Sequence, residues 1–261
     1  MLGKLIKHEI KATGRILFPL YLILLLLSVV NRVLTSIEVF SGPLNTIKVF
    51  MLSVYGLSVF ASFVVTFIVM ILRFYKNLMS DEGYLMFTIP VKPNQLINSK
   101  IIVSFMLNIL SIIVVAASLF ILLGTSKNIE MIKQIWDYIY INLKLSFEDK
   151  YAVLLAELIF MIILSLIQQI LLIYVSIAVG HLFTGHKVLG SFAAYIAINT
   201  VGQILVTIII SILAVINGTS FEALDSIPQL LFPFSIVVSI IFCILFYLGT
   251  NYIFNRKLNL E

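Results

Sequence analysis

The sequence has very little charge for its length. Only 11% of its 261 residues are charged and 61% are hydrophobic, with a mean hydropathy of +1.15. In a soluble chain about a quarter of the residues are normally charged. A soluble domain of this size could not form its surface from so few charged side chains. The composition therefore excludes a soluble globular protein and predicts an integral membrane protein.

Cysteine and catalytic groups are also scarce. The single cysteine, Cys243, cannot form an intramolecular disulfide. His181 and His186 have no third ligand nearby, so no metal site is expected there. Gly180 and Gly185 have the spacing of a phosphate-binding loop, but His186 replaces its lysine and no strand precedes it. We therefore predict that the chain is not an enzyme and holds no cofactor of its own.

Six apolar runs are each long enough to cross a membrane, since a hydrocarbon core about 30 Å thick needs roughly 20 helical residues. The runs do not alternate between apolar and polar residues as transmembrane strands would, so we expect helices. The expected fold is an all-α membrane protein with six transmembrane helices and a single transmembrane domain over residues 1–261. The predicted spans are Ile16–Val33, Val49–Leu72, Ile101–Leu123, Leu154–Val179, Leu189–Val215 and Leu230–Tyr252.

Basic residues flank these spans unevenly. Of the 17 Lys and Arg residues, eleven lie on the side that holds both termini, and six lie on the other side together with seven acidic residues. Because cytoplasmic loops carry an excess of Lys and Arg, both termini are expected in the cytosol. This asymmetry accounts for the net charge of +5, and the excess basic residues are expected to contact anionic membrane lipid. Because the charge is explained in this way, we expect no nucleic-acid partner.

Three segments outside the spans are expected to contact the membrane. Residues 1–15 place apolar and basic side chains on opposite helix faces, which predicts an interfacial elbow helix; the alternative is a basic flank that only fixes topology. Residues 124–150 repeat apolar side chains at helical spacing around Trp136, which predicts a second interfacial helix on the outer side. Pro228 and Pro233 bracket a short apolar stretch, which predicts a re-entrant outer segment before the sixth helix.

Polar residues inside the spans are the candidates for a translocation path. Glu157 is the only acidic residue within a span, and ionisable groups at membrane depth are functional candidates. Gln168 follows eleven residues later, a rotation of about 20° past whole turns, so both lie on one helix face. Asn108, Asn199 and Gln203 complete the predicted path.

Two alternatives remain open for these residues. The Glu157 carboxylate could reach the outer interface, and amide and hydroxyl stripes often hold helices together. The hydroxyl stripes are Ser58, Ser62 and Thr66 in the second span and Ser104, Ser111 and Ser118 in the third.

A polar cytosolic loop, Tyr75 to Lys100, separates the second and third spans. Asp81 and Glu82 begin a short helical patch, where a helix N-terminus favours negative charge. An apolar face too short to span the membrane follows, and Pro90 ends it. Such an exposed apolar patch predicts a docking site for a partner; the alternative is a helix that rests on the membrane.

Within this loop, the run from Glu82 to Lys100, EGYLMFTIPVKPNQLINSK, resembles a motif between the second and third helices of type-2 ATP-binding-cassette (ABC) export permeases. The amphipathic elbow, the six spans and the proline-bearing segment before the last helix are also similar to that family. The resemblance implies that residues 75–100 contain a coupling helix that fits a cleft in a separate ATPase. The implied docking residues are Asp81, Glu82, Gly83, Tyr84, Leu85, Phe87 and Pro90.

The resemblance further implies a plasma-membrane permease subunit that exports a lipophilic or peptidic compound, such as a peptide antibiotic. The Ile-, Lys- and Asn-rich composition favours a bacterial source. The expected partners of the permease are two ABC-type ATPase subunits, which bind the ATP and Mg, and a second permease that is either an identical copy or a homologue. A non-transporting membrane scaffold or sensor that docks a cytosolic partner is the alternative. A secondary transporter is less expected, because it would usually show inverted repeats and intramembrane charges.

Overall fold

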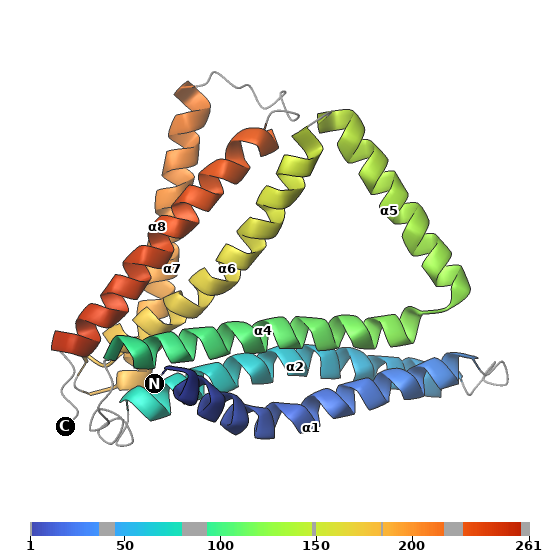
Figure 1. Cartoon of the computed structure of the whole chain (residues 1–261), viewed down its shortest axis with the longest axis horizontal. Helices are drawn as coiled ribbons and strands as arrows, with labels where there is room; N and C mark the ends of the chain where they lie inside the picture. Colours follow the sequence, from blue (N-terminus) through green and yellow to red (C-terminus); the bar gives the residue numbers. More distant parts are fainter. Residues whose placement is uncertain are drawn as a thin grey trace. The chain divides into compact units, whose positions relative to one another are not determined.

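The computed structural model describes residues 2–36, 45–79, 93–147, 150–183, 185–216 and 227–256. Within these ranges the chain forms seven helices and no strand, which confirms the all-α prediction (Figure 1). The helices are α1 (Leu2–Ser36), α2 (Asn45–Met79), α4 (Pro93–Leu123), α5 (Ser126–Phe147), α6 (Tyr151–Gly180), α7 (Lys187–Ile216) and α8 (Ile227–Arg256).

Six of these helices, all except α5, are long and apolar enough to cross a membrane. Each contains one of the six predicted spans. Helix α6, for example, has 30 residues, which at 1.5 Å per residue gives about 45 Å, more than the roughly 30 Å of a hydrocarbon core. A helix suits that environment because it satisfies every backbone polar group within the segment. The described chain therefore has the architecture of a multi-pass membrane protein.

Helix α1 runs without interruption from the predicted elbow into the first span. The predicted basic face is exposed to the surroundings, while Glu9 and Thr13 are buried on the stripe that Leu17 and Tyr21 continue. Figure 1 shows α1 as a curved helix, and Pro19 within it removes one backbone hydrogen bond. Whether residues 1–15 lie at a membrane surface stays a prediction.

Helix α5 confirms that the predicted outer segment is helical, over Ser126–Phe147. Every side chain from Glu130 to Ile141 is exposed, including Trp136 at 64% and Tyr138 at 71%. An amphipathic helix with exposed aromatic residues is typical of a membrane interface.

The predicted re-entrant segment before the sixth span is described only in part: α8 begins at Ile227 and continues through Pro233. Residues 217–226, which complete the predicted re-entrant stretch, lie outside the described residues.

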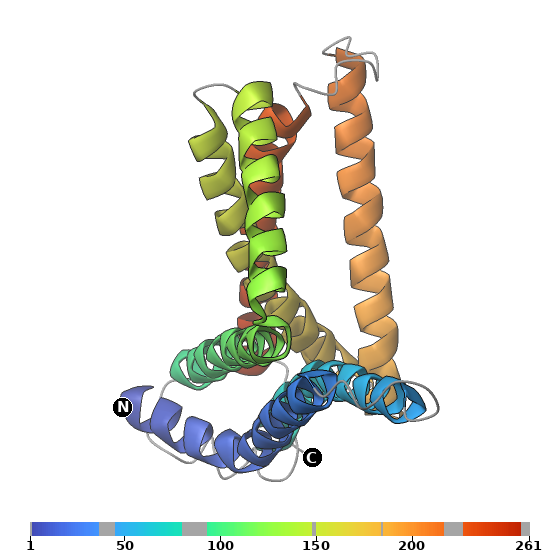
Figure 2. The same ribbon diagram turned by 90° about the vertical axis from the view of Figure 1, so that its right-hand side faces the viewer.

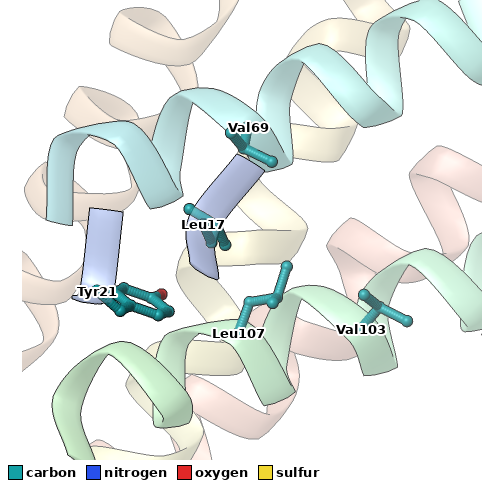
Figure 3. Packing of buried hydrophobic residues seen from close by; sticks show 5 residues of the cluster. All are labelled: Leu17, Tyr21, Val69, Val103 and Leu107. Carbon is teal, nitrogen blue, oxygen red and sulfur yellow. The ribbon is translucent and has the colours of Figure 1, made fainter. Parts of the chain in front are cut away.

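The chain divides into two compact units, one comprising Met1–Leu72 and Ile102–Ile139 and the other Arg73–Ile101 and Tyr140–Glu261. In the first unit, Leu17 and Tyr21 of α1 pack with Val69 of α2 and with Val103 and Leu107 of α4 (Figure 3). A second cluster joins the same three helices through Leu24, Tyr55 and Val115.

Hydroxyl groups join α1, α2 and α4 in the first unit. The Tyr21 hydroxyl is hydrogen-bonded to Thr66 Oγ1, at 3.2 Å, and to Ser111 Oγ, and these two are 2.9 Å apart. Tyr55 and Ser118 form a similar pair at 2.8 Å. The packing interpretation of the hydroxyl stripes is therefore confirmed for Thr66, Ser111 and Ser118.

In the second unit, the C-terminal half of α6 forms the core. Nearly every side chain from Ile170 to Gly180 is buried. The Tyr174 ring stacks on Phe74 with centroids 3.8 Å apart, and Phe254 of α8 meets Phe74 edge-on. The Tyr174 hydroxyl donates to the backbone oxygen of Lys100 at 3.3 Å. This half of α6 is thus fixed by its surroundings, whereas Leu154 is the one buried residue in the first half of the helix.

Candidate functional site

Side chains of helices α6, α7 and α8 in the second unit line an open groove of about 410 Å³. Figures 1 and 2 both show α7 diverging from α6 toward the C-terminal end of α7. The groove is lined by Gln168, Gln169, Leu172, Ile198, Asn199, Gly202, Gln203, Val206, Thr207, Phe242 and Phe246.

Helical periodicity brings these side chains together. On α7, Asn199, Gln203 and Thr207 follow one another at intervals of four residues, which places them on one helix face. On α8, Phe242 and Phe246 have the same spacing, and their rings stack with centroids 5.6 Å apart at an interplanar angle of 16°. The groove therefore has a carboxamide- and hydroxyl-bearing wall and an aromatic wall.

The groove lies near the middle of all three helices. Gln168, Asn199 and Phe242 each fall within one helical turn of the midpoint of their helix. If the helices span the membrane symmetrically, this is the region farthest from both headgroup layers. A carboxamide at that depth would be costly against hydrocarbon, so it must face protein, water or a ligand.

Three of the four carboxamides that line the groove have no hydrogen-bond partner in the part of the chain that the structure describes. Among the described residues, the side-chain amides of Gln168, Asn199 and Gln203 make no hydrogen bond to another residue. Gln169 differs, because its Nε2 donates to the Tyr195 hydroxyl at 3.1 Å. Each free carboxamide offers two N–H donors and an acceptor oxygen. The groove can therefore hydrogen-bond to a guest in both directions.

The structure brings together three of the five predicted path residues. Gln168, Asn199 and Gln203 line the groove, whereas Glu157 is half-buried about 16 Å further along α6 and does not line it. Asn108 lies on α4 in the first unit, where its Nδ2 donates to the Ser104 backbone oxygen at 3.1 Å and contacts Met70 Sδ at 3.3 Å. Its amide thus already has partners from the surrounding helices.

Sequence reasoning missed part of the lining. Gln169, Thr207, Phe242 and Phe246 were not among the predicted path residues, although all four line the groove. The sequence could have predicted the Phe242–Phe246 pair, since residues four apart on a helix are neighbours. Gln169 also had one, because it directly follows Gln168.

The lining determines which chemistry the groove can support. It contains no charged side chain, and among the described residues no group of three or more His, Cys, Asp or Glu could hold a metal ion. A nucleophile paired with a base is also absent from the lining. The lining therefore offers uncharged hydrogen-bonding groups beside apolar and aromatic side chains.

The predicted docking residues Asp81, Glu82, Gly83, Tyr84, Leu85, Phe87 and Pro90 lie in the segment 80–92, outside the described residues. Comparisons with protein-family models, with curated proteins and with solved structures found no match for the chain.

Proposed function

We propose that the chain is the transmembrane permease subunit of an ABC exporter. It moves a lipophilic or peptidic compound across a bacterial plasma membrane along a path that includes the groove, with both termini in the cytosol. A separate subunit binds and hydrolyses the ATP. A second permease, identical or homologous, completes the path.

The observation that carries the transport proposal is the mid-span position of free carboxamides on α6 and α7. Helices that only need to pack in a membrane use hydroxyls and amides as interhelical hydrogen bonds, as Tyr21, Thr66 and Ser111 do in the first unit. Gln168, Asn199 and Gln203 make no such bond within the described chain. Polar groups at that depth without a structural partner favour a path for a guest molecule.

ATP as the energy source rests on the likeness of Glu82 to Lys100 to a coupling helix. The short acidic and apolar loop between α2 and α4 suits docking to a cytosolic protein, and the chain contains no phosphate-binding loop. A subunit built in this way needs a partner for ATP hydrolysis.

The test is purification of the tagged chain in mild detergent from the cells that produce it natively. We expect an ATPase to co-purify in stoichiometric amount and the complex to hydrolyse Mg-ATP, whereas the isolated polypeptide does not. Hydrolysis by the isolated polypeptide would overturn the proposal. A stoichiometric partner without ATPase activity would instead favour a scaffold or sensor subunit.

A further inference from the structure

We propose, building on the transport function above, that the groove between α6, α7 and α8 is a binding site for an uncharged peptide segment in extended form. The free carboxamides of Gln168, Asn199 and Gln203 pair with its backbone, and Phe242 and Phe246 contact an apolar side chain.

Backbone chemistry selects this class of guest. An extended peptide exposes N–H donors and C=O acceptors that find no water inside a bilayer, and each unsatisfied group there is costly. A carboxamide side chain offers the same donor and acceptor groups. Gln168, Asn199 and Gln203 present three such groups on two facing helices, so they can replace the water that an extended peptide loses on entering the membrane.

The other guests fit this lining less well. A phospholipid would bring a charged headgroup, but no charged side chain lines the groove, and its acyl chains have no use for carboxamides. A transmembrane helix from a second copy would arrive with its backbone already hydrogen-bonded. A transition-metal ion would favour imidazole, thiolate or carboxylate ligands, which the lining lacks.

Size and shape agree with a short peptide segment. The volume of about 410 Å³ lies within the range of about 300–1,000 Å³ for small-molecule sites. Gly202 on α7 faces Phe242, since a Cβ added at Gly202 would lie 3.7 Å from the end of that ring. Gln169 is held by the Tyr195 hydroxyl, which fixes one edge of the polar wall in position.

The test measures binding of a radiolabelled Leu-Phe-Leu tripeptide, acetylated and amidated so that it carries no charge. Equilibrium dialysis uses the full chain in phosphatidylcholine nanodiscs, with empty nanodiscs as the partition control. A second probe replaces the internal amides by esters and so loses N–H donors. We expect the wild-type chain to bind the amide probe at least tenfold more tightly than the ester probe.

Substitutions that replace each carboxamide by an apolar side chain of similar shape locate the site. Gln168→Met, Asn199→Leu and Gln203→Met should each weaken binding of the amide probe several-fold. The triple variant should lose at least tenfold and bind amide and ester probes equally. Thr200→Val, next to Asn199 on α7 but outside the lining, should bind like wild type. Equal thermal unfolding midpoints for all variants show that the fold is retained.

Several results would overturn the inference. Binding that is insensitive to the three substitutions, or equal for both probes in the wild type, places the peptide elsewhere. Failure of the peptide to bind, with a phospholipid retained through purification, makes the groove a lipid site. If the wild-type chain is a dimer and the triple variant is a monomer, the groove is a contact surface between two copies of the chain. The assay contains no ATPase, so these failures remain separate from a failure of ATPase co-purification.

Discussion

The Tyr21 hydroxyl adds directional hydrogen bonds to helices that otherwise contact one another through apolar side chains. Tyr21 is buried in the first unit, where its hydroxyl shares hydrogen bonds with Thr66 of α2 and Ser111 of α4. Thr66 and Ser111 also bond to each other. Removing the Tyr21 hydroxyl therefore leaves Thr66 and Ser111 hydrogen-bonded to each other, which limits the loss of stability.

For Tyr21→Phe we predict a loss of about 0.5–1.5 kcal/mol in the free energy of unfolding, the usual net contribution of a hydrogen bond. The measurement is thermal or denaturant unfolding in detergent. Tyr247→Phe is the matched control, because the described residues give the Tyr247 hydroxyl no hydrogen-bond partner; its change should stay within about 0.5 kcal/mol. Equal effects of the two substitutions would contradict the structural role of the Tyr21 cluster.

At the scale of elements, the turn between α6 and α7 depends on a close backbone approach. A Cβ added at Gly180 would overlap the Ser191 side chain and its backbone N and Cα, and a Cβ at Gly190 would lie 3.2 Å from the Gly180 backbone oxygen. Backbone atoms cannot move aside as a flexible side chain can. The first turn of α7 is therefore packed directly against the end of α6, which fixes one end of the groove-forming helices.

Gly180→Ala should consequently destabilise the protein by about 1–3 kcal/mol, the range for overpacking a close-packed interior. Gly56→Ala on α2 is the control, since a Cβ there would meet nothing within 4 Å. Because glycine in a helix interior is less favourable than alanine by roughly 0.5–1 kcal/mol, Gly56→Ala should be neutral or stabilising. Equal shifts of the unfolding midpoint in the two variants would contradict the close approach of Gly180 to Ser191.

The elements themselves could largely be predicted from the sequence. Run length and the absence of alternation were sufficient for six helices, because a membrane-length apolar segment has few other options. Boundaries were less predictable: α8 begins three residues before the expected Leu230 and remains helical through Pro233. Proline is tolerated inside membrane helices when neighbouring groups satisfy the freed backbone, and no single sequence shows whether they do.

The groove was predictable only in part, for a related reason. The sequence placed polar stripes on several helices, and those containing Thr66 and Asn199 look alike as patterns. In the structure the Thr66 hydroxyl meets Tyr21 and Ser111, while the Asn199 amide faces an open groove. Which stripes meet depends on how the helices cross, and that follows from packing of side chains distant in sequence.

At the scale of the whole molecule, the uneven distribution of basic residues predicts the orientation. If all six candidate helices span the membrane, both termini are expected on the same side, and α5, between the third and fourth spans, on the opposite side. Cys243→Ser removes the single cysteine. On that background, Lys133→Cys on α5 should react with a membrane-impermeant maleimide on intact cells, while Lys4→Cys on α1 should react only after permeabilisation.

The cysteine-free chain is the control for this labelling and should remain unlabelled. Lys4 and Lys133 are both exposed in the structure, so a difference between them reports the side of the membrane and not burial. Labelling of Lys4→Cys on intact cells, with Lys133→Cys protected, would reverse the proposed topology.

The central claim is that this membrane subunit is driven by an ATPase held at the loop between α2 and α4. Tyr84 and Phe87 are the predicted anchors, and buried anchors of this kind typically contribute about 2 kcal/mol or more each to an interface. Since about 1.4 kcal/mol corresponds to tenfold in affinity, Tyr84→Ala with Phe87→Ala should weaken ATPase association at least tenfold. Membrane insertion should not change, because neither residue lies in a predicted span.

The most direct measurement is recovery of the ATPase with the wild-type chain and with the Tyr84→Ala, Phe87→Ala chain, at matched expression and insertion. Trp136→Ala with Tyr138→Ala on α5 is the control, because it removes two exposed aromatic side chains from the predicted outer side. We predict that the ATPase is lost with the loop variant and retained with the control. Equal recovery with all three chains would contradict the proposed docking and, with it, the assignment as an ABC permease.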